Sequence, residues 1–138
     1  MHSELNIHNN LDEVTRLAEW CEQIGEEASL GMPEVFQLNL ALEEAVSNVI
    51  NYAYPGQEGM PISLVMNGED TLFVFTLTDE GIPFNPLESE EPDLTLGAEE
   101  RPIGGLGIFL VKQLMEKVEY SRTEGKNILT MTYNTKKA

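Results

Sequence analysis

A predicted helix over residues 38–51 constrains the fold more than any other segment, because apolar side chains surround a narrow polar ridge on it. The ridge consists of Glu44, Asn48 and Asn51, which share one helix face at spacings of three and four residues. The apolar surface beside it is formed by Leu38, Leu42, Ala45 and Val49, widened by Leu40, Val46 and Ile50. Buried carboxylates and amides are costly unless something bonds to them. The ridge therefore indicates the floor of a cleft that holds a ligand or metal, with an amphipathic helix and a solvated acidic face as the alternative.

The length of 138 residues fits a single domain with its own hydrophobic core. No apolar run approaches the roughly 18 residues of a membrane span, and the N-terminus does not resemble a signal peptide. The one cysteine, Cys21, excludes an internal disulfide and lies on an apolar stripe, which favours a buried packing role over a nucleophile. We therefore expect one cytoplasmic domain over residues 1–138.

Charge is distributed unevenly along the chain. Residues 1–100 carry 21 acids and one base, and residues 101–138 carry three acids and seven bases, so the two parts have net charges of −20 and +4. Such an acidic surface repels nucleic acid and anionic membranes, and we expect neither as a partner. A basic protein partner is compatible with this charge, although acidity is also a common aid to solubility.

Periodicity along the chain predicts the order of helices and strands. Strands are expected at 4–8, 62–66, 72–78, 118–122 and 127–133, and helices at 11–28, from the Gly31/Pro33 break to Pro55, and at 106–117. Residues 67–70 and Glu124-Gly125 are the expected hairpin turns. This order predicts an α+β fold, a two-layer sandwich in which helices cover one face of a mixed, mostly antiparallel sheet.

A long loop interrupts this pattern between Asp79 and Ile103. It contains four prolines, many acids and little periodicity. Loops beyond about 12–15 residues are uncommon in compact domains and are usually lids or disordered segments. Because short glycine motifs flank it on both sides, we interpret residues 80–103 as a lid.

The first flanking motif, Asp79-Glu-Gly81-Ile-Pro83-Phe84, begins where an apolar strand ends. An aspartate there, followed by a glycine that permits a sharp turn, places a carboxylate where it accepts a hydrogen bond from a flat donor such as an exocyclic amine. An ordinary Asp-x-Gly turn is the alternative for this motif alone.

The second flanking motif consists of Gly104, Gly105, Leu106 and Gly107 and opens the last predicted helix. Free N–H groups at a helix start bind anions, and glycines let a phosphate approach closely. A glycine cap that permits tight packing is the alternative. The segment matches neither the Walker pattern nor the dinucleotide fingerprint.

Together the three segments resemble the ATP-binding Bergerat fold of the histidine kinase-like ATPase superfamily, and most closely the anti-sigma factor serine/threonine kinase family. The likeness rests on Glu44-Ala-x-x-Asn48-x-x-x-x-x-Tyr54, Asp79-x-Gly81-x-Pro-Phe, the lid and Gly104-Gly-Leu-Gly107, and it extends over nearly the whole chain. It implies ATP and Mg²⁺ as cofactors. Asn48 would be the Mg²⁺ ligand, with the remaining positions filled by phosphate and water, and Glu44 would orient or deprotonate the attacking hydroxyl.

By the same resemblance, Asp79 would read the adenine amine, Gly81 would shape that pocket, and Thr130 would complete it. Gly104, Gly105, Leu106 and Gly107 would bind the phosphates. Two departures stand out, because many relatives carry a basic residue or histidine where this chain has Tyr52, and an arginine in the glycine segment. Here the nearest bases are Arg101 and Lys112, so nucleotide affinity is expected to depend strongly on Mg²⁺.

The resemblance implies a kinase that phosphorylates a serine or threonine of a STAS-type anti-sigma antagonist and sequesters a sigma factor, with a homodimer as a further expectation. The alternative function is a non-catalytic switch that binds ATP only to fold its lid and present a partner surface. The presence of Glu44 favours phosphoryl transfer, since a protein that only binds ATP gains nothing from a carboxylate beside the phosphates. Asn51 receives no role beyond a hydrogen bond at the helix end.

Overall fold

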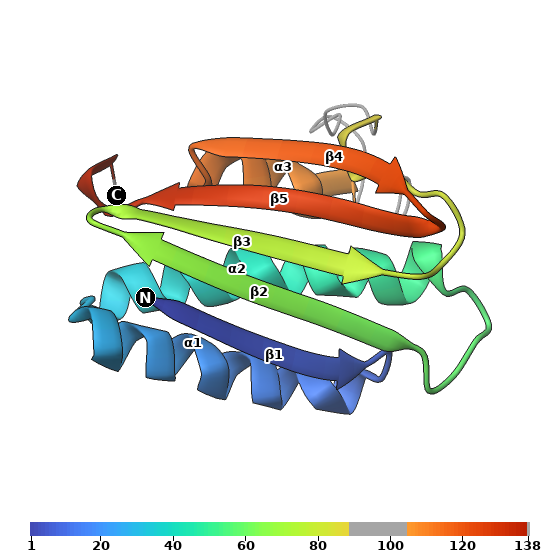
Figure 1. Cartoon of the computed structure of the whole chain (residues 1–138), viewed down its shortest axis with the longest axis horizontal. Coiled ribbons are helices and arrows are strands. Elements are labelled where there is room, and N and C mark those ends of the chain that lie inside the picture. Colours follow the sequence, from blue (N-terminus) through green and yellow to red (C-terminus); the bar gives the residue numbers. More distant parts are fainter. Residues whose placement is uncertain (89–104, 138) are drawn as a thin grey trace.

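The computed structural model describes residues 1–88 and 105–137, in which three α-helices cover one face of a five-stranded sheet (Figure 1). The expected two-layer α+β architecture is therefore confirmed. Residues 89–103 of the predicted lid lie outside the described residues, as does Gly104.

The sheet is built from β1 (His2–His8), β2 (Pro61–Glu69), β3 (Leu72–Asp79), β4 (Lys117–Thr123) and β5 (Lys126–Asn134), in the order β1-β2-β3-β5-β4. All pairings among these strands are antiparallel, so the expectation of a mixed sheet was wrong. The connections explain this. Two hairpins join β2 to β3 and β4 to β5, and between β1 and β2 one helix runs back along the sheet and the next runs forward (Figure 1).

The helices are α1 (Val14–Ala28), α2 (Met32–Asn48) and α3 (Gly105–Leu114), with a π-helical turn η2 (Val49–Ala53) after α2 and short 3₁₀ turns η1 (Leu11–Glu13), η3 (Pro86–Glu88) and η5 (Thr135–Lys137). None of the helices in the described ranges is long and apolar enough to cross a membrane. Pro33 lies in the first turn of α2 rather than before it, where its missing N–H has no helical partner to lose. The last helix ends at Leu114, earlier than expected, because Lys117 already pairs with Thr132 in the sheet.

Alternation along the strands sends every second side chain toward the helices. The core between the layers includes Leu64, Met66, Phe75, Leu77, Leu129 and Met131, all at most 5% exposed. Trp20 of α1 packs edge-on against Phe75, with ring centroids 5.9 Å apart, and its Nε1 donates to Ser3 Oγ at 2.8 Å. Cys21 is buried as expected, and burial raises the pKa of its thiol to about 12.

The first hairpin turns later than the sequence suggested. Residues 67–69 continue β2, and the turn consists of Asp70 and Thr71, with Asp70 at a φ of 55°. Gly68 serves packing rather than turning, since a Cβ there would lie 2.9 Å from the ring of Phe73 on the opposite strand. The turn at Glu124-Gly125 lies where it was expected.

A substitution of Tyr54, which follows the turn η2, tests how this part of the chain is attached to the sheet. The side chain is 1% exposed, and its hydroxyl donates to Pro61 O at 2.7 Å and accepts from Glu80 N–H at 2.6 Å. Tyr54→Phe leaves both groups without a partner and should lower the free energy of unfolding in urea by about 2 kcal/mol. Tyr133→Phe is the matched control, because its hydroxyl bonds only to the half-buried Gln37 and its loss should have a smaller effect. Equal losses in the two variants would contradict this role of Tyr54.

Candidate functional site

The three residues of the predicted polar ridge, two on α2 and one on the turn η2, lie in different environments. Asn48 is buried at 4% exposure, Glu44 lies one turn earlier and is half-buried, and Asn51 is exposed. The Nδ2 of Asn51 lies 3.5 Å from Ser47 Oγ, as expected for a residue that bonds near a helix end. Only Asn48 therefore presents a buried amide, at the end of α2 nearest the start of the predicted lid.

The π-helical turn η2 carries the chain from α2 to the base of the lid. Ala53 O at its end accepts a hydrogen bond from Ile82 N–H at 2.9 Å. Gly81 lies so close to this turn that a Cβ would meet the carbonyl and side chain of Ala53. The glycine is therefore required by close backbone packing, and it fixes the segment after β3 against the end of α2.

Asp79 ends β3 with its side chain 3% exposed. Its Oδ1 accepts from Gly81 N–H and from Asn127 Nδ2, both at 2.9 Å, so no hydrogen bond from a described residue ends on Oδ2. Burial raises the pKa of this carboxyl, while the two hydrogen bonds and the charge of Arg122 oppose the increase. The second oxygen is thus the one free for an external donor.

Asn127 of β5 was not identified from the sequence. Its Nδ2 also donates to Ile82 O at 2.8 Å. Its Oδ1 accepts from Phe84 N–H at 3.2 Å, Tyr120 OH at 2.6 Å and Arg122 Nη1 at 3.1 Å. Peptide N–H and guanidinium groups only donate and a carbonyl only accepts, so the orientation of the amide is fixed. The signal that could have revealed it is an asparagine on the apolar face of β5, level with Asp79 in the register.

A small cavity of about 20 Å³ lies between the polar groups of α2, β3 and β5. It is lined by Ala45, Asn48, Val49, Leu77, Asp79, Phe84, Pro86, Tyr120, Asn127 and Leu129. A space of this size holds about one water molecule and no heterocyclic base. Phe84 forms part of the wall and stacks on Tyr52, with centroids 5.1 Å apart and planes 26° apart. A larger ligand must therefore displace this wall.

The structure brings together only part of the site expected from the sequence. Asn48 and Asp79 line the same cavity, and Gly81 lies beside Asp79. The segment of Gly105, Leu106 and Gly107 begins α3, which packs against α2. Thr130 lies elsewhere, because the residues of β5 that face the helices are Asn127, Leu129, Met131 and Tyr133, and Thr130 points to the opposite face of the sheet. Arg101 and Gly104 lie outside the described residues.

The described residues offer few protein ligands to a metal ion. Among residues 1–88 and 105–137, no group of three or more His, Cys, Asp or Glu side chains could hold a metal ion. Mg²⁺ nevertheless needs few protein ligands when phosphate oxygens and water complete its shell. The buried Asn48 amide fits such a role, and an all-protein metal site does not fit the described residues.

Comparison with known proteins gives the same assignment at the level of family. A family model described as histidine kinase-like ATPase domain matches residues 7–133. A serine-protein kinase RsbW from Listeria monocytogenes is 31% identical over an aligned length of 120, and the alignment covers 83% of this chain and 75% of the relative. A serine/threonine-protein kinase BtrW from Bordetella bronchiseptica is 27% identical over 97 residues, which are 70% of this chain and 68% of the relative.

Solved structures support the fold. The RsbU and RsbW domains of a Mycobacterium tuberculosis protein align with a TM-score of 0.65 at 12% identity, over 96% of this chain and 32% of that one. The histidine kinase domain of a blue-light activated kinase from Erythrobacter litoralis aligns with a TM-score of 0.58 at 13% identity, over 92% of this chain and 61% of that one.

The Asp79→Asn variant tests whether the ionised Asp79 carboxylate lowers the free energy of unfolding. Because its pKa is raised in the folded state, ionisation favours the unfolded chain, and the stability of the natural protein falls as pH rises through that raised pKa. The variant should therefore be more stable than the natural protein at pH 7. The difference should disappear below about pH 3, where an aspartate with the ordinary pKa of about 3.9 is also mostly protonated. Urea unfolding across this range is the measurement, with the exposed Asp12→Asn as control. A stability gain that is the same at all pH values would contradict the assignment.

Proposed function

Because the chain belongs to the family of histidine kinase-like ATPase domains, we propose that it is an ATP-dependent serine/threonine-protein kinase of the anti-sigma type, acting as a single domain with a lid over residues 80–103. The observation that carries the proposal is that Asn48 and Asp79, from α2 and the end of β3, line one cavity at the start of that lid. Two of the relatives are named serine or serine/threonine kinases, which supports the same activity here.

Asp79 and Gly81 would form the base-recognition end of the site. The free Oδ2 of Asp79 would accept a hydrogen bond from the adenine amine, while Asn127 holds Oδ1 in place. Gly81 keeps the chain close to Ala53, and so fixes the position of its own peptide beside the carboxylate. Asn127 is thus a positioning residue for Asp79.

Asn48 and the start of α3 would hold the phosphates. The Asn48 amide oxygen would be the protein ligand of Mg²⁺, which neutralises phosphate charge when bound. Gly105 and Gly107 lie at the N-terminal end of α3, where unpaired N–H groups and the helix dipole favour anions. Arg101 and Gly104 are proposed to contribute from the lid side, with Lys112 as the basic residue of α3.

Glu44 would act on the second substrate. It lies one turn before Asn48 on α2 and is half-buried, so a serine or threonine hydroxyl bound beside the phosphates could donate to its carboxylate. Phosphoryl transfer depends mainly on positioning and on stabilising charge, so alignment of that hydroxyl is the main contribution expected of Glu44. The resemblance gives the acceptor as a STAS-type antagonist and the sequestered partner as a sigma factor.

Nucleotide binding is tested by thermal unfolding with Mg-ATP, Mg-ADP, or ATP with a chelator. Mg-ATP at a concentration about 100-fold above its dissociation constant should add about 2.7 kcal/mol of stability, and the chelator should remove most of this. Asn48→Ala should abolish the Mg²⁺-dependent part of the shift, while Asn51→Ala in the adjoining turn η2 should retain it. A shift in the natural protein that does not depend on Mg²⁺ would reject Asn48 as a metal ligand.

Catalysis is tested by measuring the transfer of labelled phosphate from ATP to the antagonist, with the natural protein and with the Glu44→Gln variant as the enzyme. The variant should bind Mg-ATP as the natural protein does and lose transfer by at least about 100-fold, since removal of a positioned catalytic group usually costs that much. Glu43→Gln, the neighbouring half-buried carboxylate, is the matched control and should keep transfer. Binding without transfer in the natural protein would favour the non-catalytic switch, and normal transfer by Glu44→Gln would reject Glu44 as a catalytic residue.

A further inference from the structure

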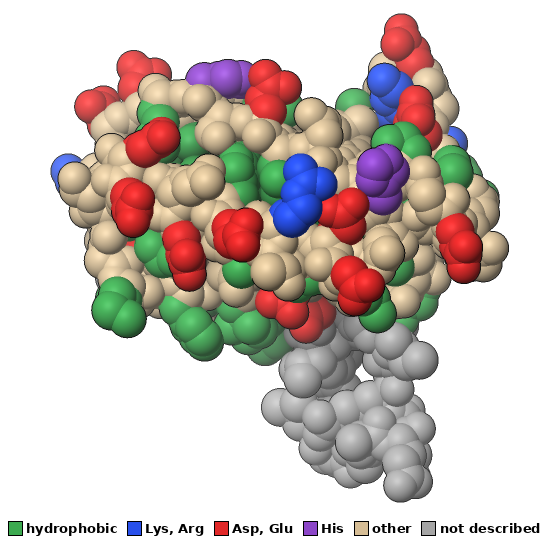
Figure 2. Space-filling model, turned by 90° about the horizontal axis from the view of Figure 1, so that it is seen from below, with side chains coloured by type: hydrophobic (Ala, Val, Ile, Leu, Met, Phe, Trp, Pro, Cys, Tyr) green, Lys and Arg blue, Asp and Glu red, His purple; other side chains and the backbone are tan. Residues whose placement is uncertain are grey.

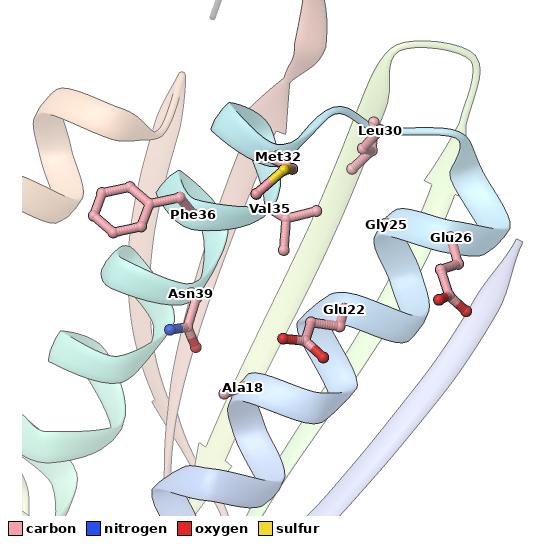
Figure 3. A pocket seen from close by; sticks show the side chains of 9 residues that line it. All are labelled: Ala18, Glu22, Gly25, Glu26, Leu30, Met32, Val35, Phe36 and Asn39. Atoms are coloured by element: carbon pink, nitrogen blue, oxygen red, sulfur yellow. The ribbon is translucent and has the colours of Figure 1, made fainter.

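A groove of about 470 Å³ lies between α1 and α2 (Figure 3). It is lined by Ala18, Glu22, Gly25, Glu26, Leu30, Met32, Val35, Phe36 and Asn39. These residues come from α1, starting at Ala18, from the link to α2 and from the first turns of α2. The groove therefore lies toward the opposite end of α2 from Asn48, and it is separate from the proposed nucleotide site.

Large apolar side chains are exposed beside this groove. Met32 is 87% exposed and Phe36 is 66% exposed, one turn apart on α2. They account for two of the six large hydrophobic side chains that are exposed in the described residues. Gathered apolar exposure of this kind marks a binding surface more often than a single exposed residue does.

The floor of the groove is fixed by a close approach of the two helices. Val35 points from α2 toward α1 (Figure 3), and a Cβ at Gly25 would lie 2.4 Å from Val35 Cγ2. Asn39 Oδ1 is enclosed at the floor and is the one buried side-chain acceptor without a hydrogen-bond partner in the described part of the chain. A buried acceptor without a donor is unfavourable, but an atom this fully enclosed is not itself a contact for a ligand in the groove.

Charge around the groove is of one sign. Glu22 and Glu26 line it one turn apart on the exposed side of α1. The sequence contains no Lys or Arg between Arg16 and Arg101, so no base of residues 17–88 compensates them. In Figure 2 carboxylates are spread over the visible face, while hydrophobic side chains gather along one edge of it. An apolar groove with an acidic rim is complementary to a ligand with apolar anchors and positive flanks.

We propose that this groove binds an amphipathic helix of a partner protein, with apolar side chains in the groove and Lys or Arg beside Glu22 and Glu26. The walls are helices whose backbone groups are already paired, so the groove offers no edge to an extended peptide, and the occupant must satisfy its own backbone. A symmetric contact between the grooves of two copies of this chain would bring their acidic rims together. The proposal goes beyond the proposed kinase activity and does not depend on it.

The test is a titration of the ¹⁵N-labelled protein with a synthetic helical peptide that carries Leu at i, i+3, i+4 and i+7 and Lys on both flanks. Amide signals of residues 18–39 should shift, and the Met32→Ser/Phe36→Ser variant should bind at least about tenfold more weakly. Both side chains are largely exposed, so this variant should fold normally. Leu11→Ser/Leu72→Ser, which removes apolar side chains that are 63% and 40% exposed elsewhere, is the matched control and should bind as the natural protein does.

Charge-reversal variants distinguish specific recognition of the peptide from non-specific hydrophobic binding. Glu22→Lys/Glu26→Lys should weaken binding of the Lys peptide at least about tenfold and improve binding of a Glu-flanked version, whereas Glu58→Lys/Glu69→Lys should do neither. Shifts confined to other surfaces, or equal binding of a scrambled peptide, would overturn the proposal. Concentration-dependent shifts of residues 18–39 without peptide would assign the groove to self-association instead. Mg-ATP stabilisation, measured on every variant, should be unchanged, so failure here is distinguishable from failure of the kinase assignment.

Discussion

The buried side-chain amide of Asn127 on β5 connects this strand to three neighbouring segments at the site. It joins β5 to the carboxylate that ends β3, to the segment that starts the lid and to the side chains of β4. Each of its polar atoms is bonded in a way that only one amide orientation permits. Because a partly satisfied buried network is costly, loss of any one partner would weaken the positions of the others.

Much of the fold follows from hydrophobic periodicity. The strands, the two long helices and the order of elements agree with the spacing of apolar residues, because burial on one face is what the spacing records. Turn positions were less accurate. The Asn67-Gly68 pair suits a turn by its local preference, but packing of Phe73 over Gly68 places the turn at Asp70 and Thr71. Tertiary contacts thus decide between local alternatives.

The position of a candidate residue was predictable where one segment carried both the pattern and the chemistry, as with Asn48 on α2 and Asp79 at the end of β3, which line one cavity. Asn127 and Thr130 were not distinguishable in this way. They are three residues apart on one strand, and only the register with β3 decides which of them faces Asp79. A slip of one residue exchanges the faces of a strand, so residue type alone cannot settle such a choice.

The nearly filled cavity beside Asp79 has a consequence for how the protein would respond to its nucleotide. In the described arrangement this cavity holds about one water, and Phe84 in its wall is stacked on Tyr52. A nucleotide would then bind only the fraction of molecules in which this wall has moved, and its apparent dissociation constant would be the intrinsic one divided by that fraction. Under the proposed function, sensitivity to ATP concentration would be set by the stability of an aromatic stack as much as by the contacts to the base.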